Sequence, residues 1–284
     1  MDPEFEAAWK ANGSPPGDIP SDIPTFQETV QATLPDAQQM LAAIRPANIV
    51  ERGIQIPIDD TFSSRTIVCQ SATSSTTPSP LVILIYGGGH CVGYPEMELT
   101  TARALVWAHN ATCILPSYRL APDHPFPTDV NDVFAVVHYI ACKATEKDGG
   151  VLPANADPKK GFVIGGLSAG AAISTQVAQL ARDLEPPLTG QFPVCGIHYV
   201  DPSAVPDRYK ELHLSMEQNK SAPIFDTASL EEYMGAYTGD KPSSLSSPYR
   251  GLSHAFWTMY PDLPATRRRM RDTVDGVGWL LGDK

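Results

Sequence analysis

The sequence lacks the features that would place it in a membrane or on nucleic acid. No apolar run approaches the ~20 residues that a membrane-spanning helix needs. Acidic residues outnumber basic ones by 32 to 21, giving a formal net charge of −11. Nucleic acid and anionic membranes both require a basic face on the protein that binds them. We therefore expect neither as a partner, and expect a small molecule instead.

Cysteine is scarce, and no two cysteines lie close together in the sequence. The five cysteines are odd in number and scattered, so neither a disulfide set nor a metal motif is expected. The first residues are acidic and contain no apolar signal-peptide segment. These absences predict a cytoplasmic protein with free, buried cysteines and with neither a metal nor another cofactor.

The pattern of apolar residues favours an α/β protein. Residues 1–45 carry two helical stretches and no strand pattern. Continuous apolar runs at 81–86, 111–115 and 161–165 alternate with helical patterns at 98–108 and 129–144. Runs that are apolar at every position are typical of strands covered on both faces, and the alternation predicts a mostly parallel sheet flanked by helices. Residues 265–281 predict a final amphipathic helix.

A serine flanked by glycines lies between the predicted strand at 161–165 and a helix-like run at 171–180. The segment is Gly166-Leu167-Ser168-Ala169-Gly170. Gly-x-Ser-x-Gly between a strand and a helix is the arrangement of a nucleophile elbow, in which a sharp turn raises the serine hydroxyl above a sheet. Ser168 is therefore the candidate nucleophile.

A run of glycines follows the most apolar predicted strand, in Tyr86-Gly87-Gly88-Gly89-His90. Without side chains, such a loop can point backbone N–H groups into a site, where they stabilise a developing oxyanion. A tight turn after the strand is the alternative. His90, beside the glycines, is a candidate substrate contact.

With these motifs in view, the chain resembles the hormone-sensitive-lipase-like esterases of the α/β-hydrolase fold, particularly the fungal members. That family carries His-Gly-Gly-Gly where this chain has Tyr86-Gly-Gly-Gly, and Gly-Asp-Ser-Ala-Gly at 166–170. It also carries a stretch very similar to residues 117–127. Its Gly-x-x-His-Gly-Phe motif matches residues 251–256, which contain His254.

The resemblance implies roles for several residues. Ser168 would be the nucleophile, His254 the base, and the N–H groups of Gly88, Gly89 and Ala169 the oxyanion hole. It also implies an ion pair between Arg119 and Asp123.

The resemblance further implies a division of the chain. Residues 1–45 would be N-terminal cap helices and 46–204 the α/β-hydrolase core. A second cap segment would span 205–245, and a C-terminal core segment with the histidine loop and last helix would span 246–284.

The acid of a Ser–His–Asp triad is not evident. In the family it lies about thirty residues before the histidine, in an Asp-Pro-x-x-Asp-like stretch that this chain lacks. Ser168 and His254 are only 86 positions apart (254 − 168). Asp201, directly after a further predicted strand at 192–200, is a candidate replacement acid, and a turn cap before Pro202 is its alternative role. The missing stretch shortens the C-terminal half of the predicted fold, so we expect the sheet to end near residues 194–200. An open edge there favours a homodimer.

Three functions remain open from the sequence. The leading one is a serine hydrolase that cleaves a small or medium acyl ester through an acyl-enzyme. The second is a non-hydrolytic enzyme that cyclises, isomerises or dehydrates a specialised metabolite, since such steps need only a base and an oxyanion hole. The third is a binding protein that keeps the pocket without chemistry. Tyr86 and Leu167, which depart from the family's His and Asp, favour the last two.

Overall fold

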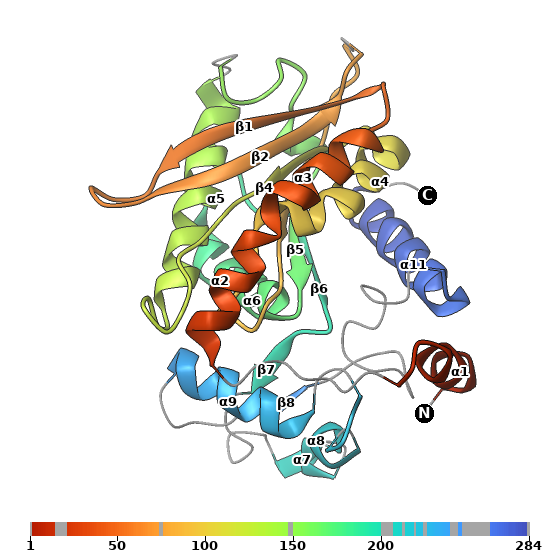
Figure 1. Cartoon of the computed structure of the whole chain (residues 1–284). Helices are drawn as coiled ribbons and strands as arrows, with labels where there is room; N and C mark the ends of the chain where they lie inside the picture. Colours follow the sequence, from red (N-terminus) through yellow and green to blue (C-terminus); the bar gives the residue numbers. More distant parts are fainter. Residues whose placement is uncertain are drawn as a thin grey trace.

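The computed structural model describes residues 2–14, 22–73, 76–146, 150–199, 207–211, 214–218, 220–223, 226–238, 244–245 and 262–282. The central sheet consists of β1 (Ile49–Pro57), β2 (Ser63–Ser71), β3 (Leu81–Ile85), β4 (Thr112–Leu115), β5 (Phe162–Leu167) and β6 (Gly190–Val194). Their order is β1-β2-β4-β3-β5-β6 (Figure 1). Strands β3 to β6 are parallel, and β2 and β1 extend the sheet antiparallel. The predicted fold class is confirmed.

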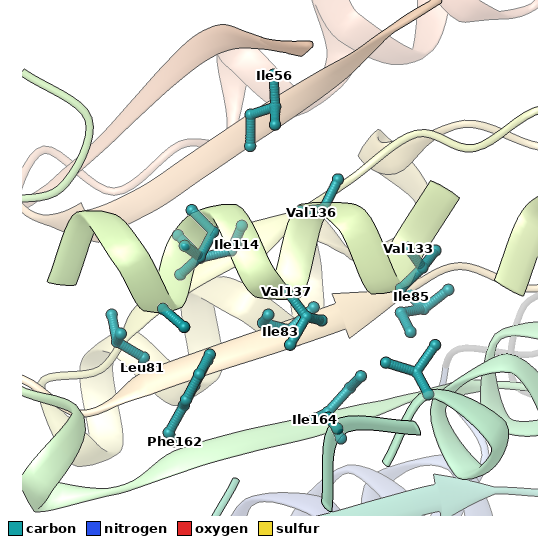
Figure 2. Packing of buried hydrophobic residues seen from close by; sticks show 14 of the residues in the cluster. Ile56, Leu81, Ile83, Ile85, Ile114, Val133, Val136, Val137, Phe162 and Ile164 are labelled. Carbon is teal, nitrogen blue, oxygen red and sulfur yellow. The ribbon is translucent and has the colours of Figure 1, made fainter. Parts of the chain in front are cut away.

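Helices cover both faces of this sheet. The helices are α5 (Thr128–Glu146) and α6 (Ala169–Leu180) on one face, and α4 (Leu99–His109) and α11 (Pro264–Leu280) on the other. In β3, Leu81, Ile83 and Ile85 face the first pair (Figure 2), while Val82 and Leu84 face the second. Every side chain of β3 is therefore buried, as its continuous apolar run predicts.

The six-stranded sheet ends at β6 in the described part of the chain. The next strand, β7 (Ile197–Tyr199), pairs instead with β8 (Ser244–Leu245) in a separate two-stranded sheet. This agrees with the predicted end of the sheet near residues 194–200. Helix α11, which confirms the predicted final helix, packs closely on β6: a Cβ at Gly190 would lie 2.8 Å from Leu280 Cδ2.

The remaining helices lie outside these layers. They are α1 (Pro3–Ala11), α2 (Ile23–Ala32), α3 (Leu34–Ala43), α7 (Asp207–Lys210), α8 (Ser215–Gln218) and α9 (Thr227–Thr238), with short 3-10 turns η1 (Pro95–Glu98), η2 (Pro158–Lys160) and η3 (Ala181–Asp183). The N-terminal region has a third helix that the sequence did not predict. Pro35 cannot donate to the hydrogen-bond ladder of α2, so a new helix starts there. The division of the chain at residues 45, 204 and 245 stays a prediction.

Helices α2 and α9 come from opposite ends of the chain and meet in one apolar cluster. This cluster contains Ile23 of α2 and Leu230, Met234 and other residues of α9, and it includes Cys91 after β3. The five cysteines, which all lie in the described part of the chain, form no disulfide there, and four of them are buried, the exception being Cys142. Within the described residues, no helix has the length and apolar character to span a membrane.

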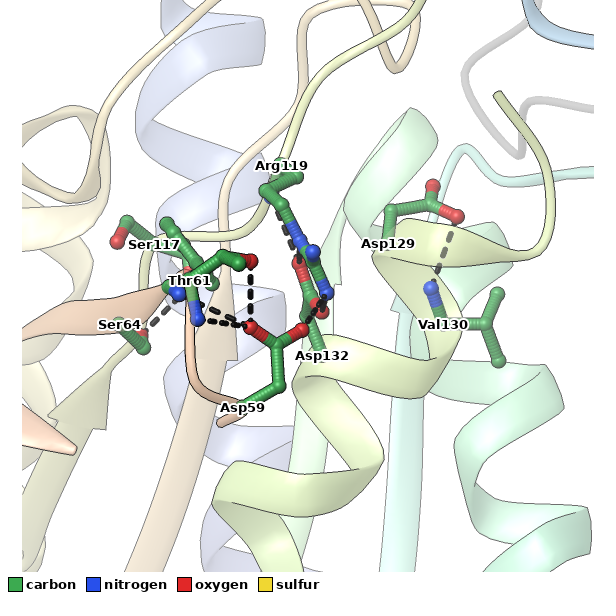
Figure 3. Close-up of polar contacts among 9 residues, drawn as sticks. Asp59, Thr61, Ser64, Ser117, Arg119, Asp129, Val130 and Asp132 are labelled. Carbon is green, nitrogen blue, oxygen red and sulfur yellow. Dashed lines mark hydrogen bonds and ion pairs between the residues drawn. The ribbon is translucent and has the colours of Figure 1, made fainter. Parts of the chain in front are cut away.

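Arg119 pairs with Asp132, and the predicted pair with Asp123 is wrong (Figure 3). Its guanidinium donates two hydrogen bonds to the Asp132 carboxylate, at 3.0 and 2.7 Å, and also contacts Asp59 at 2.9 Å. Asp132 lies in the second turn of α5 and is fully buried. A buried carboxylate needs a charged, hydrogen-bonding partner, and the bidentate contact fixes the 117–127 segment to α5.

Glu98 is a buried carboxyl immediately before α4, with 4% of its surface exposed. Burial raises the pKa of Glu98 from 4.5 to about 7, although the charge of Arg269 and a hydrogen bond with Thr101 lower it. The native state therefore binds this proton more tightly than the unfolded chain. Its contribution to stability is complete below about pH 4.5 and is lost as the pH rises through about 7.

Replacing Glu98 with Gln should remove this loss. We expect Glu98→Gln to exceed the wild type in stability by about 3 kcal/mol at about pH 8, with the difference disappearing near pH 4.5. Urea denaturation across this pH range measures it. Glu231→Gln, at an exposed position of α9, is the control and should follow the wild type. A constant difference between Glu98→Gln and wild type at all pH values contradicts the assignment.

Candidate active site

Ser168 occupies a strained turn between β5 and α6. Its backbone has φ 56° and ψ −116°, a region that residues other than glycine rarely adopt and that costs on the order of 1–3 kcal/mol. Its N–H donates to the Val194 carbonyl of β6 at 2.9 Å, and its own carbonyl accepts from Ala171 and Ala172 of α6. The surrounding backbone therefore holds the serine in place.

The two glycines of the motif are required by close packing against β3. A Cβ at Gly166 would lie 2.4 Å from the Ile85 carbonyl oxygen, and one at Gly170 would lie 2.1 Å from it. Side-chain carbons do not approach a backbone oxygen so closely, so any larger residue would force β5 or α6 away from β3. The Gly-x-Ser-x-Gly spacing thus follows from the contact between α6 and the neighbouring strand.

The glycine loop after β3 lies directly against this turn. Ile85 and Gly166 are register partners in the parallel pair β3–β5, so both strands end at the same edge of the sheet. A Cβ at Gly87 would be 2.8 Å from the Leu167 carbonyl oxygen and 3.1 Å from Ser168 Cβ. The carboxyl edge of a parallel sheet is where such folds place their ligands, and the two motifs meet there.

Backbone donors remain available at this meeting point. Gly88 has φ 131° and Gly89 has φ 60°, conformations that favour glycine. Among the described residues, the N–H groups of Gly88, Gly89 and Ala169 have no hydrogen-bond acceptor. Ala169 also begins α6, whose N-terminus carries a partial positive charge. These donors suit an anionic oxygen bound beside Ser168.

Tyr86, which stands where the family has His, is packed in the protein interior. Its ring is 2% exposed and stacks on Tyr118 at a centroid distance of 4.4 Å. The Tyr118 hydroxyl donates to the Tyr86 carbonyl at 3.0 Å. Burial raises the pKa of both phenols, so they stay neutral. This stacked pair fixes the start of the glycine loop.

His90 is buried, which differs from its predicted role as a substrate contact. Its ring is 2% exposed, and its Nδ1 lies 2.7 Å from Asp129 Oδ2. Sequence reasoning missed Asp129 as its partner. The one signal that could have pointed to it is an acidic residue at the start of the helix predicted at 129–144.

The proposed base and acid, His254 and Asp201, lie outside the described residues. Their roles therefore stay predictions, and so does the loss of the family's usual acid segment.

A large cavity lies away from the candidate site. It has a volume of about 530 Å³, and its mostly apolar lining also includes the polar residues Lys143, Asn155, Asp157 and Lys159. Its lining residues precede β3, β5 and β6, so it opens at the amino end of these strands, whereas Ser168 lies at their carboxyl end. The candidate chemistry does not involve it.

Comparison with known proteins places the chain in a family. A family model described as an alpha/beta hydrolase fold matches residues 82–265. Carboxylesterase NlhH of Mycobacterium tuberculosis is 32% identical over 160 residues, which cover 56% of this chain and 44% of NlhH. The chain therefore aligns with less than half of that relative.

Two other relatives align over more of their length. Versiconal hemiacetal acetate esterase of Dothistroma septosporum is 24% identical over 256 residues, covering 72% of this chain and 74% of the esterase. Among solved structures, vibralactone cyclase superposes with a TM-score of 0.81 at 22% identity, covering 99% of this chain and 95% of the cyclase. At this identity the superposition supports the fold alone.

The strain at Ser168 predicts that two substitutions with the same effect on reactivity differ in their effect on stability. Both Ser168→Ala and Ser168→Gly remove the hydroxyl. Only glycine relieves the positive φ, so we expect Ser168→Gly to be more stable than Ser168→Ala by about 1 kcal/mol. Chemical denaturation of the two variants measures this difference. Equal stability, or a more stable alanine variant, would show that the turn stores no strain.

Proposed function

Because the chain belongs to the alpha/beta hydrolase fold family, we propose that it is a serine hydrolase that cleaves a small or medium acyl ester through an acyl-enzyme on Ser168. One observation carries the proposal: the strained Ser168 turn lies against the glycine loop. Backbone N–H groups are available both in that loop, at Gly88 and Gly89, and directly after the serine, at Ala169. A nucleophile beside preorganised donors is the arrangement that acyl transfer requires.

The reaction follows from these groups. Ser168 Oγ attacks the ester carbonyl carbon while His254 accepts the hydroxyl proton. The carbonyl oxygen becomes negative and accepts hydrogen bonds from the Gly88, Gly89 and Ala169 amides. Collapse of this intermediate expels the alcohol, which takes the proton from His254, and leaves the acyl group on Ser168. Water, deprotonated by His254, then attacks the acyl carbon, releasing the acid and restoring the serine.

Asp201 would orient His254 and stabilise its protonated form. In a Ser–His–Asp triad, replacing the acid by Asn lowers kcat about 10⁴-fold, because the histidine then adopts the wrong tautomer. Loss of one oxyanion donor costs about 2.7–4 kcal/mol of transition-state stabilisation.

Relatives and composition support the substrate class. Two similar proteins are named as esterases, and one of them is named for an acetate ester. A short acyl group is therefore the first substrate to test. The net charge of −11 supports a small-molecule ligand over nucleic acid. We further propose that the protein is cytoplasmic and that it assembles as a homodimer.

A second candidate is a ring-closing enzyme that uses the same site. We name it because vibralactone cyclase, a protein named as a cyclase, shares this fold over nearly the whole of both chains. The chemistry differs only in the second step: a hydroxyl within the acyl group, instead of water, would attack the acyl carbon and close a lactone. An alternative without any acyl-enzyme would need His254 but not Ser168.

We expect a fluorophosphonate probe to add one label to the wild-type protein and none to Ser168→Ala, as measured by intact mass. Ser174→Ala is the matched control, because Ser174 is a buried serine of α6, the helix that begins directly after Ser168. It should label as the wild type does. Labelling that persists in Ser168→Ala, or a folded wild type that takes no label, contradicts the hydrolase proposal.

The same preparations separate the remaining alternatives. Hydrolysis of an acetate ester that disappears in Ser168→Ala supports the esterase. Turnover of a metabolite that survives Ser168→Ala but fails in His254→Ala supports the form of the second candidate that uses no acyl-enzyme. An Asp201→Asn variant with the full esterase rate would eliminate Asp201 as the acid.

A further inference from the structure

We propose that a buried His90–Asp129–Tyr237 cluster, built with residues of α5 and α9, holds the oxyanion loop in its working geometry, with α2 supporting the far end of the loop. His90, Asp129 and Tyr237 are then positioning residues for transition-state stabilisation. We define the oxyanion loop as residues 86–93. The inference rests on the proposed function for the role of the loop's amides, and the contacts themselves come from the structure.

The cluster is built on the residue that follows the last glycine. His90 has φ 65°, and its Nδ1 lies 2.7 Å from Asp129 Oδ2, with the side chains only 2% and 1% exposed. The backbone carbonyl of His90 accepts from the Ala121 N–H at 3.0 Å. A buried, charge-assisted hydrogen bond is directional, so the position of Asp129 fixes the backbone directly after Gly89.

Helix α9 completes the cluster through Tyr237. The Tyr237 hydroxyl donates to Asp129 Oδ1 at 3.0 Å, and its ring stacks on His90 at a centroid distance of 3.7 Å. Burial, together with the charge of Asp129, raises the pKa of Tyr237, so the hydroxyl remains a donor. The Val130 N–H donates to the same Asp129 oxygen at 2.8 Å. Both carboxylate oxygens are therefore engaged, one by His90 and the other by α9 and α5.

A second tyrosine of α9 contacts the loop one turn earlier. A Cβ at Gly89 would lie 2.2 Å from Tyr233 Cδ1, so the tyrosine ring lies on the glycine itself. Residues four apart share one face of a helix. The α9 face thus presents Tyr233 to Gly89 and Tyr237 to His90.

Side chains of helix α2 donate hydrogen bonds to backbone carbonyl groups at the other end of the loop. Gln27 Nε2 donates to the carbonyls of Cys91, at 2.6 Å, and of Ala121, at 2.7 Å. Gln31 Nε2 donates to the Gly93 carbonyl at 3.2 Å. The carbonyls after the glycines are therefore bound by side chains of α2, while the Gly88 and Gly89 N–H groups remain available to a substrate oxygen.

This arrangement predicts a kinetic signature. Donors stabilise a transition state fully only when they are already in place, and a displacement near 1 Å can cost about 10²-fold in rate. Loosening the cluster should therefore lower kcat while KM, which reflects ground-state binding, stays close to the wild-type value. Simple destabilisation would instead lower the melting temperature without changing kcat of the folded enzyme.

The test compares Tyr237→Phe with a matched control, Tyr139→Phe, which removes a hydroxyl from α5 away from the loop. At a temperature where all variants are folded, we expect Tyr237→Phe to lower kcat for an acetate ester about 10- to 100-fold, with KM changed less than twofold. Asp129→Asn, which keeps the shape of the carboxylate, should lose less activity than Asp129→Ala. Tyr139→Phe should match the wild type.

Hydrogen exchange of the peptide covering residues 86–95 supplies a readout that does not depend on catalysis. We expect faster exchange there in Tyr237→Phe and in Asp129→Asn, and no change in Tyr139→Phe. If the wild type proves inactive on esters but the loop still loosens, the proposed function fails and the positioning of the loop stands. An active enzyme in which Tyr237→Phe and Asp129→Ala keep both kcat and slow loop exchange overturns the inference.

Discussion

The candidate site depends on the close approach of three backbone segments at the carboxyl edge of the sheet. The Ile85 carbonyl at the end of β3 lies so near Gly166 and Gly170 that neither position has room for a side chain. This contact brings the first turn of α6 onto β3, and with it Ser168 onto Gly87. Because backbone atoms define the site, its geometry is set mainly by strand register and helix packing. Glycine at these positions is a geometric requirement.

Polar contacts away from the serine keep that edge rigid. Arg119 and Asp132 connect the segment after β4 to α5, and Arg65 forms a bidentate pair with Glu96 at 2.8 and 2.7 Å, connecting β2 to the turn before α4. His90 and Asp129 connect the glycine loop to α5. Each contact joins a segment near the sheet's carboxyl edge to a neighbouring strand, turn or helix. Breaking one partner of such a pair leaves a buried charge without compensation, which is strongly destabilising.

Local sequence was sufficient to predict the sheet, the serine turn and the glycine loop, because each depends on a short pattern. Runs apolar at every residue predicted β3 and β5, and Gly-x-Ser-x-Gly predicted the turn at Ser168. The resemblance to hormone-sensitive-lipase-like esterases is confirmed at the level of the family. Pairings between distant residues were harder: Asp132, and not Asp123, binds Arg119, because α5 places its second turn beside the guanidinium. The contact between His90 and Tyr237 joins residues 147 positions apart (237 − 90), and no local pattern encodes it.

The most direct test of this account is a crystal structure of the protein after reaction with a small phosphonate ester, whose tetrahedral phosphorus resembles the acyl-transfer intermediate. The account predicts a covalent bond from Ser168 Oγ to phosphorus. It also predicts a phosphoryl oxygen within hydrogen-bonding distance, about 2.7–3.1 Å, of the Ala169 amide nitrogen and of Gly88 or Gly89. An adduct on another residue, or an adduct on Ser168 whose oxygen points away from these amides, would contradict it.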